Sequence, residues 1–259
     1  MENNLYKRSL YTKKVRYLIN EIYEYNISKA NVSILMESGM ITQETYDMFC
    51  QMPKYQREVA IGYMQKNKKI SDALKIGFEN SRKMLIEYNG LTEDDVLSIK
   101  KDAFYVLRKL NQTKFGLINF TLRNRYDIYI NCCNIEIYYG LNALDNTDDS
   151  VIDIKGITDD NLKSYHSAYL SFIAYILKLV VTSNIDSAIQ ELISFIQKYD
   201  NKELDIDYYR EFNSQSMFRI GQYGVRFIDE SYKDCLNIAC NQLFNRELFS
   251  ILMDIKYRK

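Results

Sequence analysis

The sequence predicts an α+β protein, and three observations lead to this fold class. Alternating apolar and polar residues over 17–25 favour a strand. Two runs of branched and aromatic residues flank the polar triplet 100–102, which indicates a β-hairpin over 95–107. After residue 158 the apolar residues recur with helical spacing. A strand, helices, a hairpin, further sheet and a helical part, in this order, are typical of the α+β class.

Several helices are predicted between the first strand and the hairpin, although a helix over 9–22 is an alternative to the first strand itself. The first of these helices covers 28–38, with Ser28 as its N-cap and Gly39 as its stop. Pro53 ends the second helix and can occupy the first turn of the third. The second, third and fourth helices are expected at 42–52, 54–66 and 71–88.

The sheet is expected to continue after the hairpin, because short runs rich in branched and aromatic residues follow it. These further strands are predicted at 113–121, 126–131, 135–139 and 151–157. The last part of the chain is expected to add terminal helices and two strand-like runs, 216–220 and 225–228.

Two domains are predicted from the change in composition near Thr158. The first is an α+β domain over 1–157, and the second is a mainly helical module over 158–259. An apolar helix over 159–181 and an amphipathic helix over 186–199 lie close together in the second part, which suggests an αα-hairpin.

Composition limits the classes of function. Lys+Arg and Asp+Glu both number 34 in 259 residues, which argues against a wholly basic surface but not against a local basic groove. No run of about 18 apolar residues predicts a membrane span, and the N-terminus has no apolar signal segment, so a cytoplasmic protein without membrane contact is expected. The five cysteines lack metal-ligand spacing and are expected to be reduced thiols, and one histidine cannot make a histidine-based site.

Asp102 lies in the polar break of the predicted hairpin, with Lys100 and Lys101 beside it. A carboxylate held at the tip of a rigid hairpin is well placed to hold a metal ion. The alternative is an ordinary surface turn, because Asp is a common turn residue.

Two stretches of the chain resemble the palm motifs of DNA polymerases. Residues 23–31 (Tyr-Glu-Tyr-Asn-Ile-Ser-Lys-Ala-Asn) resemble the first palm motif of the viral family B form, and residues 98–106 (Ser-Ile-Lys-Lys-Asp-Ala-Phe-Tyr-Val) are similar to the later motif. Between them, residues 54–63 are placed like the fingers helix that binds the nucleotide triphosphate. Residues 122–126 and 152–157 look like the segments that lead to a helical thumb. The resemblance covers about residues 20–200.

The resemblance implies two-metal chemistry with Mg²⁺ or Mn²⁺. Palms of this kind bring two carboxylates onto adjacent strands, so Asp102 would be one metal ligand and the backbone carbonyl of Ile27 another. The resemblance expects Asp at position 26, where this chain has Asn26, whose amide offers an oxygen but no charge. Glu24 and Asp95 are nearby acids that could supply part of the missing charge, and strand alternation places Glu24 on the face of Asn26.

The same resemblance implies residues that bind substrates. Arg57 would contact the triphosphate with help from Lys54, although a solvated helix face is the alternative. The aromatic candidate could instead be packed in the core, and the lysines of the hairpin could simply keep the turn soluble. The residues expected to contact nucleic acid are Lys100, Lys101, Arg123, Arg125, Tyr126 and Lys155.

The leading hypothesis is therefore a palm-type nucleotidyltransferase with a helical thumb-like module, which transfers a nucleotide from a dNTP to the 3′-hydroxyl of a primed nucleic acid. The alternatives are a pseudo-polymerase disabled by Asn26, which would bind nucleic acid or a replication partner, and a phage interaction protein that acts on host defence. Abundant Tyr, Lys, Asn and Ile resemble the usage of phages with AT-rich genomes, and the short chain suggests a partner subunit in the host cytoplasm.

Overall fold

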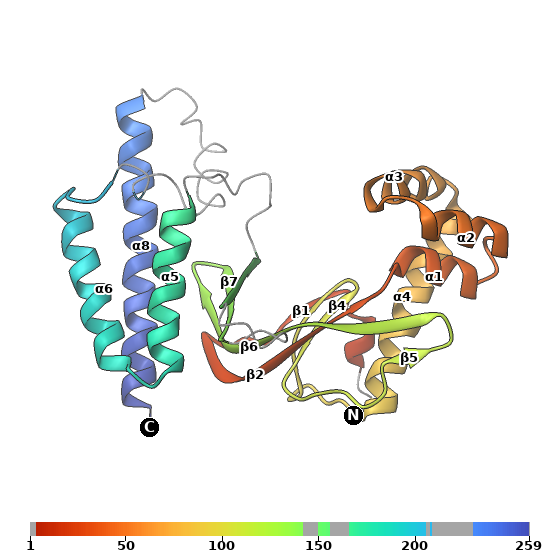
Figure 1. The fold of residues 1–259 in the computed structure, drawn as a ribbon, viewed down its shortest axis with the longest axis horizontal. Helices are drawn as coiled ribbons and strands as arrows, with labels where there is room; N and C mark the ends of the chain where they lie inside the picture. The colour runs from red at the N-terminus through yellow and green to blue at the C-terminus, as the bar shows by residue number, and fades with distance from the viewer. Residues whose placement is uncertain (1–3, 142–149, 156–165, 206–207, 209–229, 259) are drawn as a thin grey trace. The chain divides into compact units, whose positions relative to one another are not determined.

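The computed structural model describes residues 4–141, 150–155, 166–205, 208 and 230–258, and it confirms an α+β protein built from antiparallel strands and helices (Figure 1). The chain forms two compact units. Unit 1 comprises Met1–Lys14 and Glu21–Arg125, and unit 2 comprises Val15–Asn20 and Tyr126–Lys259. Two long strands, β2 and β6, each contribute residues to both units.

The sheet of unit 1 is antiparallel. Its strands are β1 Leu10–Thr12, β2 Tyr17–Ile27, β3 Val96–Lys100, β4 Ala103–Val106, β5 Lys114–Phe115 and β6 Ile118–Cys132. Neighbouring strands hydrogen bond in the order β1-β3-β4-β2-β6, and β5 pairs with β6. The predicted strand at 17–25 is thus confirmed as part of β2.

The β3–β4 hairpin confirms the prediction for residues 95–107. Lys100 pairs with Ala103, and Lys101 and Asp102 form the two-residue turn between them. Lys101 has φ of 59°, a left-handed value that such tight turns require. Strand β4 then pairs back onto β2, with Asn26 opposite Ala103, so the two motifs lie on adjacent strands.

The helices between β2 and β3 follow the predicted order. They are α1 Ala30–Glu37, α2 Gln43–Gln51, α3 Lys54–Met64 and α4 Lys68–Asn89. Thr42 caps α2 by accepting the N–H of Thr45, and Gly90 ends α4 with φ of 58°. The predicted cap at Ser28 is wrong, because Lys29 precedes α1 in the left-handed conformation, with φ of 50°.

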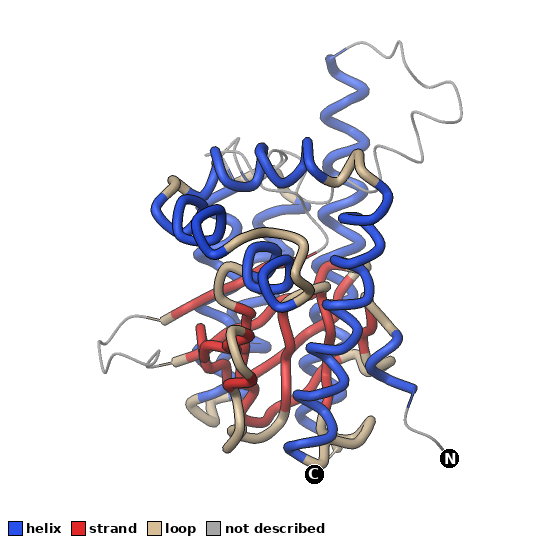
Figure 2. Tube along the Cα trace, turned by 90° about the vertical axis from the view of Figure 1, so that its right-hand side faces the viewer, coloured by secondary structure: helices blue, strands red, loops and turns tan. Residues whose placement is uncertain are grey.

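The core of unit 1 lies between helices α1–α4 and the strands β2, β3, β4 and β6. In Figure 2 the blue helices of this unit lie in front of its red strands. Helices α1 and α4 come very close, because a Cβ built on Gly77 would lie 2.1 Å from Cγ2 of Ile34. The buried side chains at the centre of this core are Tyr25, Ile27, Ile34, Leu35, Leu85, Ile99, Phe104 and Phe120.

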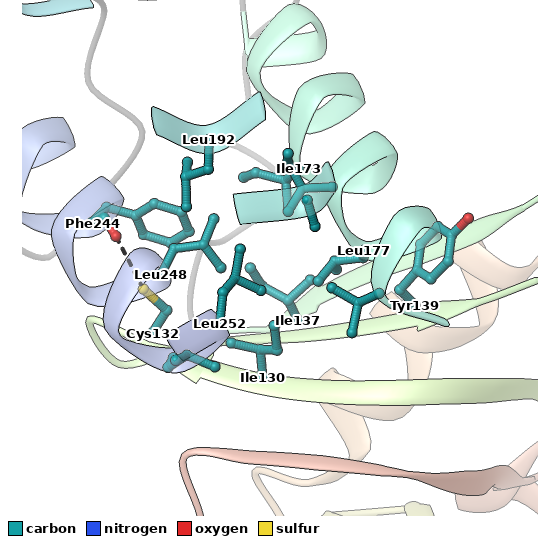
Figure 3. Packing of buried hydrophobic residues seen from close by; sticks show 14 of the residues in the cluster. Ile130, Cys132, Ile137, Tyr139, Ile173, Leu177, Leu192, Phe244, Leu248 and Leu252 are labelled. Atoms are coloured by element: carbon teal, nitrogen blue, oxygen red, sulfur yellow. Dashed lines mark hydrogen bonds between the residues drawn. The ribbon is translucent and has the colours of Figure 1, made fainter. Parts of the chain in front are cut away.

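Unit 2 has a second core between strands and helices. Its elements are the second part of β6, β7 Ile135–Gly140, β8 Val151–Lys155, α5 His166–Val181, α6 Ile185–Asp200 and α8 Glu230–Tyr257. Helix α5 presents Ile173 and Leu177, and α8 presents Leu248 and Leu252, to the strand residue Ile137 (Figure 3). The β6–β7 turn is left-handed at Cys133 (φ 52°) and Asn134 (φ 63°).

Some predicted boundaries differ from the structure. The two compact units divide the chain near Arg125 instead of near Thr158, because β7 and β8 pack with the C-terminal helices. The strands predicted at 113–121 and 126–131 belong largely to one continuous 15-residue strand, β6. The predicted runs 216–220 and 225–228, and the first part of the helix predicted at 159–181, lie outside the described residues. Among the helices of the described residues, none combines the length and apolar character needed to cross a bilayer.

Candidate functional site

The site predicted from the two motifs lies in unit 1, where the end of β2 meets the β3–β4 turn. The N–H of Ile27 donates to the carbonyl of Asp102 over 3.1 Å, one position beyond the pair formed by Asn26 and Ala103. Residues about 75 positions apart in the sequence therefore meet through the backbone. Asp102 lies in the turn, so the turn geometry and not the strand pleat sets the direction of its carboxylate.

Asn26 has a buried side-chain oxygen without a donor. Within the described part of the chain, Oδ1 of Asn26 has no hydrogen-bond partner and almost no contact with solvent. The backbone carbonyl of the same residue accepts a hydrogen bond of 3.2 Å from the hydroxyl of Thr121. An unsatisfied buried acceptor costs about 1–3 kcal/mol, so this amide oxygen is the atom of the site that most needs a partner.

Glu24 lies on the same face of β2 as Asn26, because residues two apart in a strand point the same way and are about 6.6 Å apart. Only 6% of Glu24 is exposed. Its Oε2 accepts a hydrogen bond of 2.9 Å from Nδ2 of Asn124 on β6. A buried carboxylate thus lies beside the unsatisfied amide, as strand alternation predicted.

The two lysines of the turn differ in their surroundings. Nζ of Lys100 donates to the Thr12 hydroxyl over 2.9 Å, which ties β3 to β1. The side chain of Lys101 is exposed, and its N–H donates to the carbonyl of Ser9 over 2.8 Å. Of these two, Lys101 presents its cation to solvent.

Arg57 is a buried cation with an unsatisfied nitrogen. It is 8% exposed, and within the described residues its Nε has no hydrogen-bond partner, although a Glu58 carboxylate oxygen lies 3.9 Å away. Nδ2 of Asn31, five residues after Asn26, donates to Oε2 of Glu58 over 3.0 Å. The predicted alternative of a solvated helix face is therefore wrong for Arg57, whereas Lys54 is exposed.

The remaining residues expected to contact nucleic acid are not all available. Arg123 is exposed, and Nη1 of Arg125 lies 3.4 Å from a Glu21 carboxylate oxygen. The ring of Tyr126 is 0% exposed and lies 5.4 Å from that of Tyr138, so stacking of this ring on a base is corrected to core packing. In unit 2, Nζ of Lys155 lies 2.8 Å from Asp153.

Asp95 has a structural role at the start of β3. Its carboxylate accepts hydrogen bonds from the N–H and the hydroxyl of Thr92 and from Nε of Arg108. Burial alone would raise the pKa of Asp95, but these hydrogen bonds and the Arg108 charge hold its pKa below the usual range. Its oxygens are therefore engaged at the start of β3, and a contribution of its charge at Asn26 stays a prediction.

A further group of possible metal ligands, not predicted from the sequence, occurs in unit 2. The sulfurs of Cys132 and Cys133 and a carboxylate oxygen of Glu247 lie within 4.8 Å of one another. Glu247 accepts hydrogen bonds from both the N–H and the Sγ of Cys133, over 2.9 and 3.0 Å. It thus gives the backbone N–H of the left-handed turn an acceptor. Burial raises the pKa of the Cys132 thiol strongly, which favours the neutral thiol. Only the adjacency of the cysteines was visible in the sequence, because Glu247 follows more than a hundred residues later.

A groove of about 1060 Å³ opens elsewhere in unit 1, between α1, α4 and the β5–β6 turn. Its lining includes the apolar side chains Ile34, Ile76, Met84 and Phe115. None of the predicted catalytic or substrate-binding residues lines it.

Comparison with known proteins gives one family. A search of curated proteins finds no match to the chain. Residues 1–255 match the family described as bacteriophage PBS1 gene 130 protein, and this match supports the phage origin that the composition suggested. Because the match extends over almost the whole chain, the protein belongs to the bacteriophage PBS1 gene 130 protein family.

Proposed function

We propose that unit 1 is a nucleotidyltransferase domain of the palm type, whose metal site lies where β2 meets the β3–β4 turn. The observation that carries the proposal is the buried Oδ1 of Asn26, which has no hydrogen-bond donor among the described residues. Asn26 pairs with Ala103, the residue that follows Asp102. A hard cation such as Mg²⁺ or Mn²⁺ prefers oxygen ligands, and it would satisfy this orphaned acceptor.

The residues present fit such an ion in their chemistry. Asp102 would supply a carboxylate, Asn26 an amide oxygen and Ile27 a backbone carbonyl, while buried Glu24 adds negative charge on the face of Asn26. When bound, the ions would activate a primer hydroxyl and stabilise the charge on the transferred phosphoryl group.

Substrate binding belongs to the same proposal. Arg57 would contact the triphosphate of a dNTP, because its Nε has no hydrogen-bond partner among the described residues and the Asn31–Glu58 contact ties its helix α3 to α1, which follows β2. Lys101 and Arg123, both exposed, would contact the phosphates of primed nucleic acid. A phage-encoded enzyme of this kind would act in the cytoplasm of the infected host, together with a partner subunit.

Primer extension tests the proposal. We expect Asn26→Asp to incorporate at least tenfold more nucleotide than the natural chain with Mg²⁺ or Mn²⁺, because the new carboxylate restores the charge that these ions prefer. Asn26→Asp/Asp102→Ala should abolish that gain. Asp94→Ala in the Asn26→Asp background is the matched control, because the Asp94 side chain is 96% exposed and lies outside the site.

A second candidate function is an inactive relative that keeps the binding site, and Asn26 itself favours it because an amide carries no charge. This candidate would be established if the natural chain incorporates no nucleotide while the Asn26→Asp variant does. If no variant incorporates nucleotide and none binds primed template, both functions are overturned, and an interaction protein that acts on a host or phage partner remains.

A further inference from the structure

The outer face of α3 is exposed although it is largely apolar. Tyr55, Val59 and Tyr63 recur every four residues and are 80%, 41% and 66% exposed. At this spacing they form one stripe, on the side of α3 opposite to the buried residues Arg57 and Ile61. Tyr55 and Tyr63 are largely exposed, so these two rings add little to the packing of unit 1.

Gly62 lies within α3 beside this stripe, and neither packing nor backbone conformation in the described residues requires a glycine there. A Cβ built on Gly62 would meet no atom of another element within 4 Å in the described part of the chain, and the φ of Gly62 is not left-handed. A glycine inside a helix costs about 1 kcal/mol relative to alanine. The fold therefore gains nothing from this glycine, whereas a flat site lets a ligand approach the helix backbone closely.

The surroundings of the stripe are basic in a chain of zero net charge. Residues 53–70 carry five basic side chains and one acidic side chain. Nζ of Lys66 lies 4.7 Å from the ring centroid of Tyr63. Among the described residues, Lys66, Lys68 and Lys69 form no ion pair, and all three are exposed.

We propose that this outer face, formed by Tyr55, Val59, Gly62, Tyr63 and Lys66 together with Lys68 and Lys69 at the start of α4, binds single-stranded nucleic acid. Aromatic rings that stack on bases, combined with cations that follow the phosphates, are the arrangement that single strands require. Tyr55 and Tyr63 are eight residues apart, about 12 Å along a helix, so two separate bases can stack on them. The face extends the proposed function, but binding here needs neither a metal ion nor Asp102.

Fluorescence anisotropy with labelled dT20 and rU20 in EDTA tests the proposal on the full chain. The natural chain should bind with a Kd of about 1–100 µM at physiological salt, as is usual for non-specific binding, and more tightly at low salt. Tyr55→Ala and Tyr63→Ala should each weaken binding about tenfold, because one stacked base is lost. Equal losses for the two oligonucleotides indicate a surface that serves DNA and RNA alike, whereas a loss for one assigns the surface to that polymer.

Matched variants separate this face from general effects. Tyr88→Ala is the control, because Tyr88 is 71% exposed on α4 and should leave the affinity unchanged. Replacing Lys66, Lys68 and Lys69 by Gln should reduce the slope of log K against log salt by about 0.7 per lost phosphate contact. Gly62→Leu should weaken binding while circular dichroism shows an unchanged helix content.

The outcome is independent of primer extension. Loss of binding in the tyrosine variants supports the surface even if no variant incorporates nucleotide, and Asp94→Ala, outside both sites, should bind like the natural chain in EDTA. Unchanged binding in Tyr55→Ala/Tyr63→Ala, or no binding by the natural chain at low salt, overturns the proposal. The exposed stripe would then be assigned to a protein partner.

Discussion

Asn26 and aspartate have nearly the same shape, so a single charge separates the two functions considered for unit 1. In both functions, the buried Oδ1 of Asn26 needs a hydrogen-bond donor or a cation, because it has no partner among the described residues. An aspartate at this position would also need its charge balanced, because a buried carboxylate on the face of Glu24 is stable only with a cation or a proton. An amide at this position carries no charge that a metal ion or a proton must balance.

Asp95 makes stability depend on pH. Its pKa is lowered in the folded chain, so its contribution is complete above the ordinary value of 3.8 and is lost as the pH falls through the folded-state pKa. We expect Asp95→Asn to lower the free energy of unfolding by about 2 kcal/mol at pH 7, since hydrogen bonds to a charged group are lost. Urea unfolding should show the difference shrinking toward pH 2. Asp94→Asn, at an exposed position, should show almost no difference.

Two glycines should respond in opposite directions to the same substitution. Gly77→Ala should destabilise unit 1 by about 1–3 kcal/mol, because the new methyl group would overlap the buried side chain of Ile34. Gly62→Ala should stabilise it by up to about 1 kcal/mol, since nothing lies within 4 Å and alanine favours the helix. Thermal unfolding of both variants measures the two changes in stability. A stabilising effect of Gly77→Ala, like that of Gly62→Ala, would contradict the close approach of α1 and α4.

At the scale of elements, local signals predicted well where local residues decide the structure. The β3–β4 hairpin depends on a polar pair between two apolar runs, and α4 ends at Gly90, so both could be predicted. The continuity of β6 could not. Asn124 and Arg125 look like loop residues, but partners on β2 hold them, Glu24 at 2.9 Å and Glu21 at 3.4 Å. Only the three-dimensional pairing supplies those partners.

For the candidate site, too, some features could be predicted from local sequence and others depend on long-range contacts. The adjacency of the two motifs followed from a resemblance between short stretches. The burial of Arg57, and the lack of a partner for Oδ1 of Asn26 within the described part of the chain, depend on the whole fold of unit 1. The start of α1 was misplaced because Ser28 is a good cap residue in isolation. In the folded chain its N–H donates to the carbonyl of Asn119, which keeps it in the sheet.

The β6–β7 turn depends on α8, and this dependence is testable. Glu247→Ala removes the acceptor of the Cys133 N–H, so we expect a loss of about 1–3 kcal/mol in the free energy of unfolding. Arg246→Ala, at the neighbouring exposed position, is the control and should change little. Chemical denaturation measures both, and equal effects would mean that solvent satisfies the turn as well as Glu247 does.

At the scale of the whole molecule, the two cores are linked by shared strands. Strands β2 and β6 run through both units without interruption, so the backbone of one unit continues directly into the other. We expect one cooperative transition in urea, followed by circular dichroism, and Phe104→Ala in unit 1 or Leu248→Ala in unit 2 should shift it as a whole. Two separated transitions would show that the units unfold independently.

Strand β2 also sets the order of events during synthesis. It leaves the ribosome early, but Asn26 pairs with Ala103, which is made 77 residues later (103 minus 26). At about 5–20 residues per second, about 4–15 s pass between the synthesis of Asn26 and that of Ala103. During this time both edges of β2 lack their partner strands, and the apolar side chains of Tyr25 and Ile27 are not yet covered. A nascent chain stalled before residue 103 therefore presents an unpaired apolar strand, and chaperone binding should be strongest in that interval.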